Sequence, residues 1–289
     1  MRIEYDIYQR LMWDPGFRRR FLADREATIA GSYPDCREPG LFTQLNASGL
    51  EEEAFRRMAA LYRTSKDMLP RSHNLLMSFC GIAFFEAVLA DFFDFTQSGR
   101  RAGKSLEILE PFDGYAVGPM ILDLAESWPG ENMGWIRGVV RYEWALWQAR
   151  RVAGGWPPLR ITPPLAEGAT LVSTDYDLKA LLREITRLEN SAVGSEVFLW
   201  RIEPGPGSYH AAIYPRDGQV MEAKLDAASF AELKEAIARE RPCDMNEDLK
   251  GTVAKIGLIL ASSFLCCSRE GTYGEIVPDM SGVVEPQPH

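Results

Sequence analysis

A proline-rich segment near the middle of the chain sets the first limit on its fold. Residues 154–168, GGWPPLRITPPLAEG, hold four prolines in fifteen positions. Each proline fixes the backbone φ angle and lacks an amide donor, so the segment can form neither a helix interior nor a central strand. Prolines also stiffen a connection toward the polyproline conformation. The sequence therefore predicts a domain boundary here, with a linker over residues 154–168.

The residues before this linker have the periodicity of a helical bundle. Helices are predicted over Ile3–Trp13 and over Pro15–Ala23, where Asp14 is the expected N-cap. Ser48 and Glu51 form a capping-box pattern ahead of four apolar positions at helical spacing, Phe55, Met58, Leu61 and Tyr62. These patterns indicate amphipathic helices that pack together in a helical domain over residues 1–153.

The most apolar stretch lies within this helical part. Residues 74–95, NLLMSFCGIAFFEAVLADFFDF, are apolar on nearly every helical face, as in a central buried helix or a membrane span. Glu86, Asp91 and Asp94 interrupt the stretch, and carboxylates are costly inside a bilayer. Asp91 and Asp94 could act as an acid and base or hold a cation, but the solvated edge of a core helix also explains them. We expect one long core helix and no membrane contact.

Beyond the linker, short strands alternate with helices. Around Asp217-Gly218 the pattern is that of a tight hairpin turn. Strands are predicted at 170–174, 196–202, 209–214 and 219–225, and helices at 177–188, 227–239 and 246–266. The proline-containing tail at 278–289 is expected to be disordered. The fold class is therefore α+β: an N-terminal helical bundle followed by a smaller domain, residues 169–277, with a short, mostly antiparallel sheet and helices.

The charge balance disfavours two classes of partner. The chain carries 32 Lys and Arg against 41 Asp and Glu, a formal charge of −9, which repels phosphate backbones and anionic lipid surfaces. Its basic clusters, Arg18 to Arg20 and Arg100, Arg101 and Lys104, are most simply solvated faces. We expect no nucleic acid and no membrane as partners. Five cysteines without CxxC spacing, and no signal-peptide pattern, indicate a reduced, cytoplasmic protein.

The inventory of reactive side chains predicts no catalytic residue, metal site or cofactor in this chain. Its three histidines, His73, His210 and His289, lack the spacing of metal ligands, and no glycine-rich phosphate loop precedes a helix. Asp175 and Asp177 flank Tyr176 where a helix is expected to begin, so they are better explained as capping residues.

Large aromatic side chains and arginines gather next to the linker. Trp144 and Trp147 recur at helical spacing in the segment Trp135–Ala149, with Arg137, Arg141 and Arg150 beside them. Tryptophan and arginine are enriched at the centres of protein interfaces, although core packing explains some of the tryptophans. These five residues are the predicted docking surface for a partner protein.

Three segments carry a resemblance to a known family. Arg141 to Ala145 match an Arg-x-Glu-Trp-Ala helix, Leu171–Leu182 matches a strand followed by a helix, and Tyr209–Leu225 matches a hairpin. As a set they resemble the accessory proteins that accompany multinuclear non-haem iron-dependent peptide oxidases, as in the methanobactin and 3-thiaglutamate pathways. The resemblance covers about half of the chain, mainly residues 135–240.

This resemblance implies a function in peptide modification. An accessory subunit of this kind is not itself an enzyme: it forms a heterodimer with a TIM-barrel oxidase that holds the iron, and it binds the leader of a ribosomally made precursor peptide, which the oxidase modifies, with cysteine as the expected target. An extended leader can add a strand to a free sheet edge. The two candidate edges are Leu171, Val172 and Ser173, and Val220, Met221, Glu222 and Ala223.

Two other classes of function stay open from the sequence. A nucleic-acid-binding regulator requires a positive face, which the charge balance disfavours. An independent cysteine-dependent enzyme requires a thiol beside an imidazole, and Cys80 with His73 is the nearest such pair. Seven residues on one helix separate these two side chains by about 10 Å, which is too far for direct activation.

Overall fold

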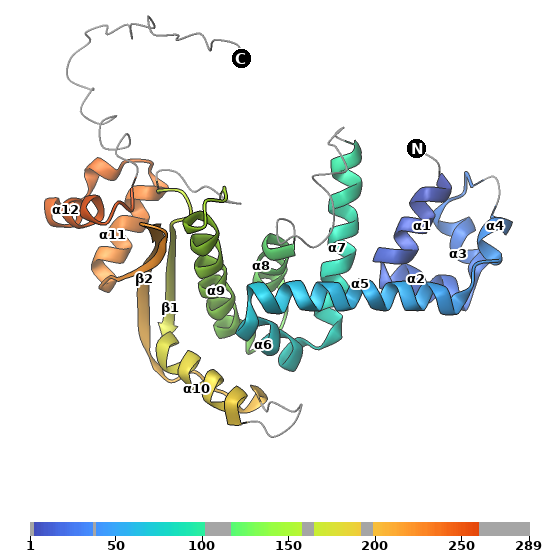
Figure 1. The fold of residues 1–289 in the computed structure, drawn as a ribbon, viewed down its shortest axis with the longest axis horizontal. Helices are drawn as coiled ribbons and strands as arrows, with labels where there is room; N and C mark the ends of the chain where they lie inside the picture. The colour runs from blue at the N-terminus through green and yellow to red at the C-terminus, as the bar shows by residue number, and fades with distance from the viewer. Residues whose placement is uncertain (1–2, 37–38, 102–116, 158–164, 192–198, 260–289) are drawn as a thin grey trace, which may run out of the picture.

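The computed structural model describes residues 3–36, 39–101, 117–157, 165–191 and 199–259. Helices fill the N-terminal half, and a three-stranded antiparallel sheet with helices around it follows (Figure 1). The predicted α+β fold is confirmed. The linker residues 158–164, the strand residues 196–198, the helix residues 260–266 and the tail at 278–289 lie outside the described part of the chain.

Side-chain caps mark the start of two of the four N-terminal helices. They are α1 (Ile3–Trp13), α2 (Pro15–Ala23), α3 (Arg25–Ser32) and α4 (Gly40–Thr43). The Asp14 carboxylate accepts a hydrogen bond from the Phe17 amide at 2.8 Å and so caps α2, as predicted. α3 was not among the predicted helices; Asp24 caps it by accepting from the Ala27 amide.

The long helix α5 (Ala47–Met68) begins earlier than predicted. Asn46 is its N-cap, and the Asn46 side chain accepts from the Ser48 amide, so Ser48 lies inside the helix and the predicted capping box is wrong. Leu61 is buried as expected, but Phe55 is 73% exposed, so the predicted apolar face does not include it. Asn46 competes successfully because its short side chain reaches the free amides of the first turn.

The predicted core helix at 74–95 is in fact two helices. α6 (Pro70–Cys80) and α7 (Ile82–Arg101) meet at Gly81, where the axis bends by 112°. Gly81 has a φ of +67°, a conformation that glycine adopts without steric cost. Among the described residues no single helix is both long and apolar enough to cross a bilayer. The bent pair reaches the length and apolar composition of a membrane span only when its two helices are counted together.

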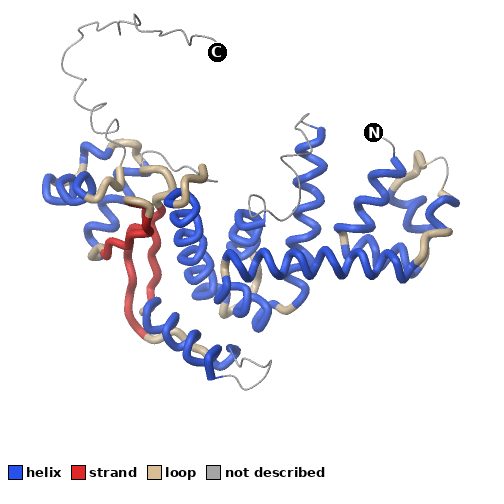
Figure 2. Tube along the Cα trace, viewed as in Figure 1, coloured by secondary structure: helices blue, strands red, loops and turns tan. Residues whose placement is uncertain are grey.

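The tryptophan-rich segment forms the central helix of the molecule. α9 (Met133–Ala153) contains the predicted helix Trp135–Ala149 and packs beside α8 (Val117–Ser127). Its other side contacts the sheet (Figure 2). The α9 backbone approaches the sheet closely at Gly138, where an added Cβ would lie 2.1 Å from the Tyr176 hydroxyl.

The sheet is built from β1 (Thr170–Tyr176), β2 (Pro206–Arg216) and β3 (Gln219–Lys224), in that order and all antiparallel. Asp217 and Gly218 both have positive φ, 52° and 73°, which confirms the tight turn between β2 and β3. The prediction of a strand at 196–202 is wrong at its C-terminal end, because Leu199–Arg201 forms a 3₁₀ turn.

Three further helices complete the part after the linker. α10 (Leu178–Ser191) follows β1 and is capped by Asp177, while α11 (Ala227–Ala238) and α12 (Glu247–Lys255) follow the hairpin. α12 ends at Lys255, before the predicted end at residue 266, because the chain leaves the helix at Gly257, where φ is +68°.

The sheet lies between two apolar clusters. Val172, Ala211 and Ile213 belong to the cluster that also contains the buried residues of α9 and the N-terminal helices, while Ala212 and Tyr214 belong to a second cluster with Leu233 and Val253 of α11 and α12. Adjacent residues of β2 point to opposite faces, which explains the division. One continuous core therefore joins the helical part to the sheet on both sides of the predicted linker.

Candidate functional site

Both predicted leader-binding segments lie on edge strands. β2 is central, and β1 and β3 flank it within the described sheet. The Leu225 amide donates to the His210 carbonyl at 3.0 Å, so the even-numbered residues of β2 direct their main-chain groups toward β3. The odd-numbered residues then direct theirs toward β1, opposite Thr170, Val172 and Thr174. The register thus determines which edge amides are available to a peptide.

This register divides the predicted peptide-binding residues into two groups. Leu171 and Ser173 on β1, and Val220 and Glu222 on β3, direct their main-chain groups away from β2, as an added strand requires. The main-chain groups of Val172, Met221 and Ala223 pair with β2 instead. Val172 is also 1% exposed on the face that packs against α9. Only the residues whose main-chain groups point away from β2 could bind a peptide backbone.

A cluster of polar side chains supports β3 from the α9 side. The Lys179 ammonium of α10 forms an ion pair with Glu222 of β3 and donates to the Tyr142 hydroxyl of α9, which itself donates to Glu222 at 3.0 Å. Lys179 also lies over the Tyr142 ring at 4.5 Å and over the Tyr209 ring at 5.4 Å. The cluster fixes β3 to two helices that are distant in sequence.

Both charged members of this cluster are stabilised in their ionised forms. Burial acts to lower the pKa of Lys179, but the hydrogen bonds and the charge of Glu222 outweigh it and raise that pKa above its ordinary value. Burial acts to raise the pKa of Glu222, but Lys179 holds it below its ordinary value. A pair of this kind stays charged at neutral pH, which suits a structural support better than proton transfer.

The Arg-x-Glu-Trp-Ala motif of α9 joins several elements. Glu143 is 3% exposed, and its carboxylate accepts from the Ser72 amide and hydroxyl, both at 2.8 Å, at the start of α6. Burial raises the pKa of Glu143, although the hydrogen bonds from Ser72 oppose this shift. Arg141 forms a two-point ion pair with Glu126 of α8. The residues that carry the family resemblance therefore have a clear packing function.

The five predicted docking residues differ in their accessibility. Trp144 is 4% exposed and lies against Gly118 of α8, so in this arrangement it belongs to the core rather than to a surface. Arg137 donates to the Ala125 and Trp128 carbonyls at the end of α8, at 2.9 and 2.8 Å. Of the others, Trp147 stacks on Trp144 at 5.3 Å and is half-buried, and Arg141 and Arg150 are exposed. A partner could reach Arg141, Trp147 and Arg150.

The cysteine and histidine side chains of α6 do not form a catalytic pair. The Cys80 thiol contacts the Met133 sulfur at 3.6 Å, and burial raises its pKa. His73 Nδ1 is 3.1 Å from the Ser65 hydroxyl, and burial lowers the pKa of His73 to about 4. Since a nucleophilic cysteine needs a lowered pKa, this arrangement provides no activation.

The arginine run of α2 is largely exposed, as predicted: Arg19 and Arg20 are exposed and Arg18 is half-buried. Arg18 donates to the Leu11 carbonyl at 3.0 Å, and Arg19 pairs with Glu86 of α7 at 2.7 Å. Within the described ranges, no group of three His, Cys, Asp or Glu residues is placed to hold a metal ion. The second basic cluster lies largely outside what the structure describes, which excludes the side chains of Arg100 and Arg101 and the whole of Lys104.

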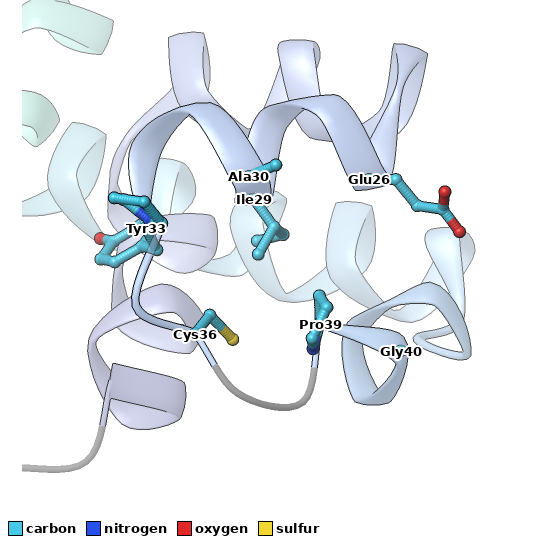
Figure 3. A pocket seen from close by; sticks show the side chains of 8 residues that line it. Glu26, Ile29, Ala30, Tyr33, Cys36, Pro39 and Gly40 are labelled. Carbon is cyan, nitrogen blue, oxygen red and sulfur yellow. The ribbon is translucent and has the colours of Figure 1, made fainter.

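A hollow of about 550 Å³ opens between α3 and α4 at the N-terminal end. Figure 3 shows Ile29 and the Cys36 thiol directed toward it, while the Glu26 carboxylate points away. The Tyr33 hydroxyl, at the rim, donates to Asp6 at 2.9 Å. The hollow therefore offers an apolar surface with a single thiol.

Sequence comparison identifies no relative from which a function can be transferred. No protein-family model matches the chain, and no curated protein matches it significantly.

Proposed function

We propose that this chain is a non-catalytic accessory subunit that binds the leader of a ribosomally made precursor peptide and forms a complex with a TIM-barrel iron-dependent oxidase. The iron belongs to the oxidase, which modifies the peptide, with cysteine as the expected target. One observation carries the proposal: among the residues that the structure describes, both candidate leader-binding segments are edge strands of the antiparallel sheet. Extended peptides bind such edges through main-chain hydrogen bonds.

The support behind the sheet favours a binding function. α9 covers one face, and Lys179 with Tyr142 ties β3 to the helices, so the β3 edge is held in place before a peptide arrives. A preorganised edge avoids part of the ordering cost of binding. Among the described side chains, Cys80, His73 and Glu143 are all engaged in packing contacts.

The docking surface of the proposed complex comprises three accessible residues of α9. Arg150 and half-buried Trp147 lie near its C-terminal end. Arg141 lies about two turns earlier and projects from a different side of the helix. Arginine and tryptophan suit such a surface because they combine apolar area with directed donors. We place the complex in the cytoplasm, where its thiols stay reduced.

The test is co-expression of the chain with a TIM-barrel iron oxidase and a short cysteine-containing precursor encoded beside its gene. We expect a heterodimer by light scattering, and leader binding by the chain in fluorescence titration. Arg150→Glu should weaken the complex while leaving the melting temperature unchanged, and Lys234→Glu on α11 is the control. The proposal would be refuted if the chain formed no complex and bound no leader at concentrations of about 100 µM, where even a weak interface is detected.

A further inference from the structure

A groove lies where β3 ends and α10 begins. It has a volume of about 370 Å³ and is open to solvent, with Lys179 and Arg183 of α10 on one side and Lys224 at the end of β3 on the other. Ser208, Tyr209 and His210 of β2 also line it. None of these β2 residues was among the predicted peptide-binding positions. The groove lies beyond Lys224, the last residue of β3.

The β2 residues in this lining form a second, shorter sheet edge. β2 extends to Pro206 and pairs with β1 over that length, but β3 leaves the sheet after Leu225 donates to His210. No β3 residue in the described ladder lies opposite Ser208. The register between β1 and β2 shifts between Thr174 and Tyr176, so Ser208 is paired in neither described ladder, and it lines the groove. Ser208 itself is exposed.

Three cations and two carboxylates line the groove. Lys179 is already paired with Glu222, so Arg183, one turn further along α10, and exposed Lys224 are the cations that a ligand would meet. The two carboxylates in the lining are engaged: Asp177 accepts from the Ala180 amide at 2.9 Å, and Asp226 from the Ser229 amide at 2.8 Å. In a chain with a net charge of −9, such a site selects a negatively charged ligand.

We propose that this groove binds an acidic, extended segment of a peptide. One residue of the segment pairs with the main chain of Ser208, and the carboxylates of the segment lie between Arg183 and Lys224. We take the segment to be part of the leader, a choice that rests on the proposed function. The leader would run along β3 and enter the groove past Lys224. The extended backbone of such a segment can pair with main-chain groups, and its carboxylates complement the cations.

The test uses three synthetic peptides with the full-length chain. They are acetylated and amidated eight-residue peptides that alternate Thr with Glu, Gln or Lys. We expect the Glu peptide to bind and to shift the Ser208 amide resonance, with the Gln peptide at least about threefold weaker and the Lys peptide weaker still. Arg183→Gln and Lys224→Gln should each weaken Glu-peptide binding about threefold, as expected for an exposed ion pair. Lys234→Gln, the same charge change outside the groove, should not.

Each outcome bears on the groove separately from the proposed function. Any of three results would overturn the groove assignment. The Glu and Gln peptides bind equally, the Glu peptide does not bind, or Lys224→Gln and Lys234→Gln have equal effects on binding. A leader that binds wild type and the Arg183→Gln and Lys224→Gln variants alike would also overturn it, while leaving the accessory function intact. Glu-peptide binding without any oxidase complex or leader binding would retain the groove and refute the accessory function.

Discussion

At the scale of single residues, the buried Glu143 is the clearest case of a polar group with a defined task. Its carboxylate lies in a low-dielectric site, yet it satisfies the Ser72 amide and hydroxyl at the first turn of α6. A helix N-terminus attracts negative charge and needs acceptors for its free amides. Glu143 therefore substitutes for a local capping residue, which α6 lacks.

Replacement of Glu143 by Ala should be strongly destabilising. The change leaves the Ser72 donors buried without an acceptor, so we expect a loss of about 3 kcal/mol in the free energy of unfolding. Urea denaturation measures the loss. The control is Glu126→Ala, which breaks the exposed pair with Arg141 and should cost less than about 1 kcal/mol. Similar losses in both variants would contradict the capping function.

His73 should make the fold sensitive to acid. Its pKa is about 4 in the folded chain, against about 6.5 in an unfolded one. Between these values only the unfolded chain binds the proton, so stability should fall as the pH decreases, by up to about 1.4 kcal/mol per pH unit. Denaturation of wild type and His73→Gln at pH 7 and pH 5 tests this. An identical pH dependence in both proteins would be evidence against it.

At the scale of secondary-structure elements, the contact between α9 and β1 depends on a single glycine. A Cβ at Gly138 would lie 2.1 Å from the Tyr176 hydroxyl and 2.7 Å from the Thr174 methyl group. The Tyr176 hydroxyl also donates to the Trp135 carbonyl at 2.7 Å. Helix and strand can approach this closely only because no side chain separates them.

Gly138→Ala should therefore push α9 away from the sheet. We expect a loss of about 2 kcal/mol from the resulting overpacking, measured by chemical denaturation. Gly134→Ala, on the same helix, is the matched control because a Cβ there meets nothing within 4 Å. That variant should gain up to about 1 kcal/mol through helix propensity. A neutral Gly138→Ala would show that the two elements can separate without cost.

The two edge strands can be distinguished by proline substitution. The Val220 amide faces away from β2, whereas the Met221 amide pairs with it. Val220→Pro should retain the circular dichroism spectrum but reduce leader affinity about tenfold or more, because an added strand loses a donor and meets the proline ring. Met221→Pro should lower stability itself. Ser173→Pro on β1 should leave leader affinity unchanged; the reverse result would assign the leader to β1.

At the scale of the whole molecule, the helical part and the sheet share one hydrophobic core. Val172, Ala211 and Ile213 are each less than 2% exposed, and they belong to the same cluster as the buried residues of α9. The predicted division at residues 154–168 thus marks a change in secondary structure. That it also separates two folding units stays a prediction, and the continuous core is an argument against it.

The chain cut after Gly154 should accordingly fail to fold as two independent parts. The fragment 155–289 loses the cover that α9 provides, so its apolar sheet face would be exposed to water. We expect poorly dispersed amide resonances for this fragment and recovery of dispersion when residues 1–154 are added. A well-dispersed spectrum of the fragment alone would establish a separate domain.

Local signals in the sequence were sufficient for much of the secondary structure. Asp14 before Pro15, Asp217-Gly218, and the apolar spacing of Trp135–Ala149 each predicted an element that the structure contains. Caps, tight turns and amphipathic faces depend on residues a few positions apart, so they can be read without knowledge of the fold. The same local rules misplaced the start of α5, since Asn46 and Ser48 are both acceptable caps.

Only the tertiary structure decided which distant residues meet. Lys179 joins Tyr142 and Glu222, which are 37 and 43 positions away in the chain, and Glu143 caps a helix 71 positions away. The sequence identified the two strand segments as possible edges, but strand order, register and the free edge at Ser208 followed only from the folded sheet. The physical reason is that pairing and burial depend on the packing of the whole chain, because each contact is stable only when the others form.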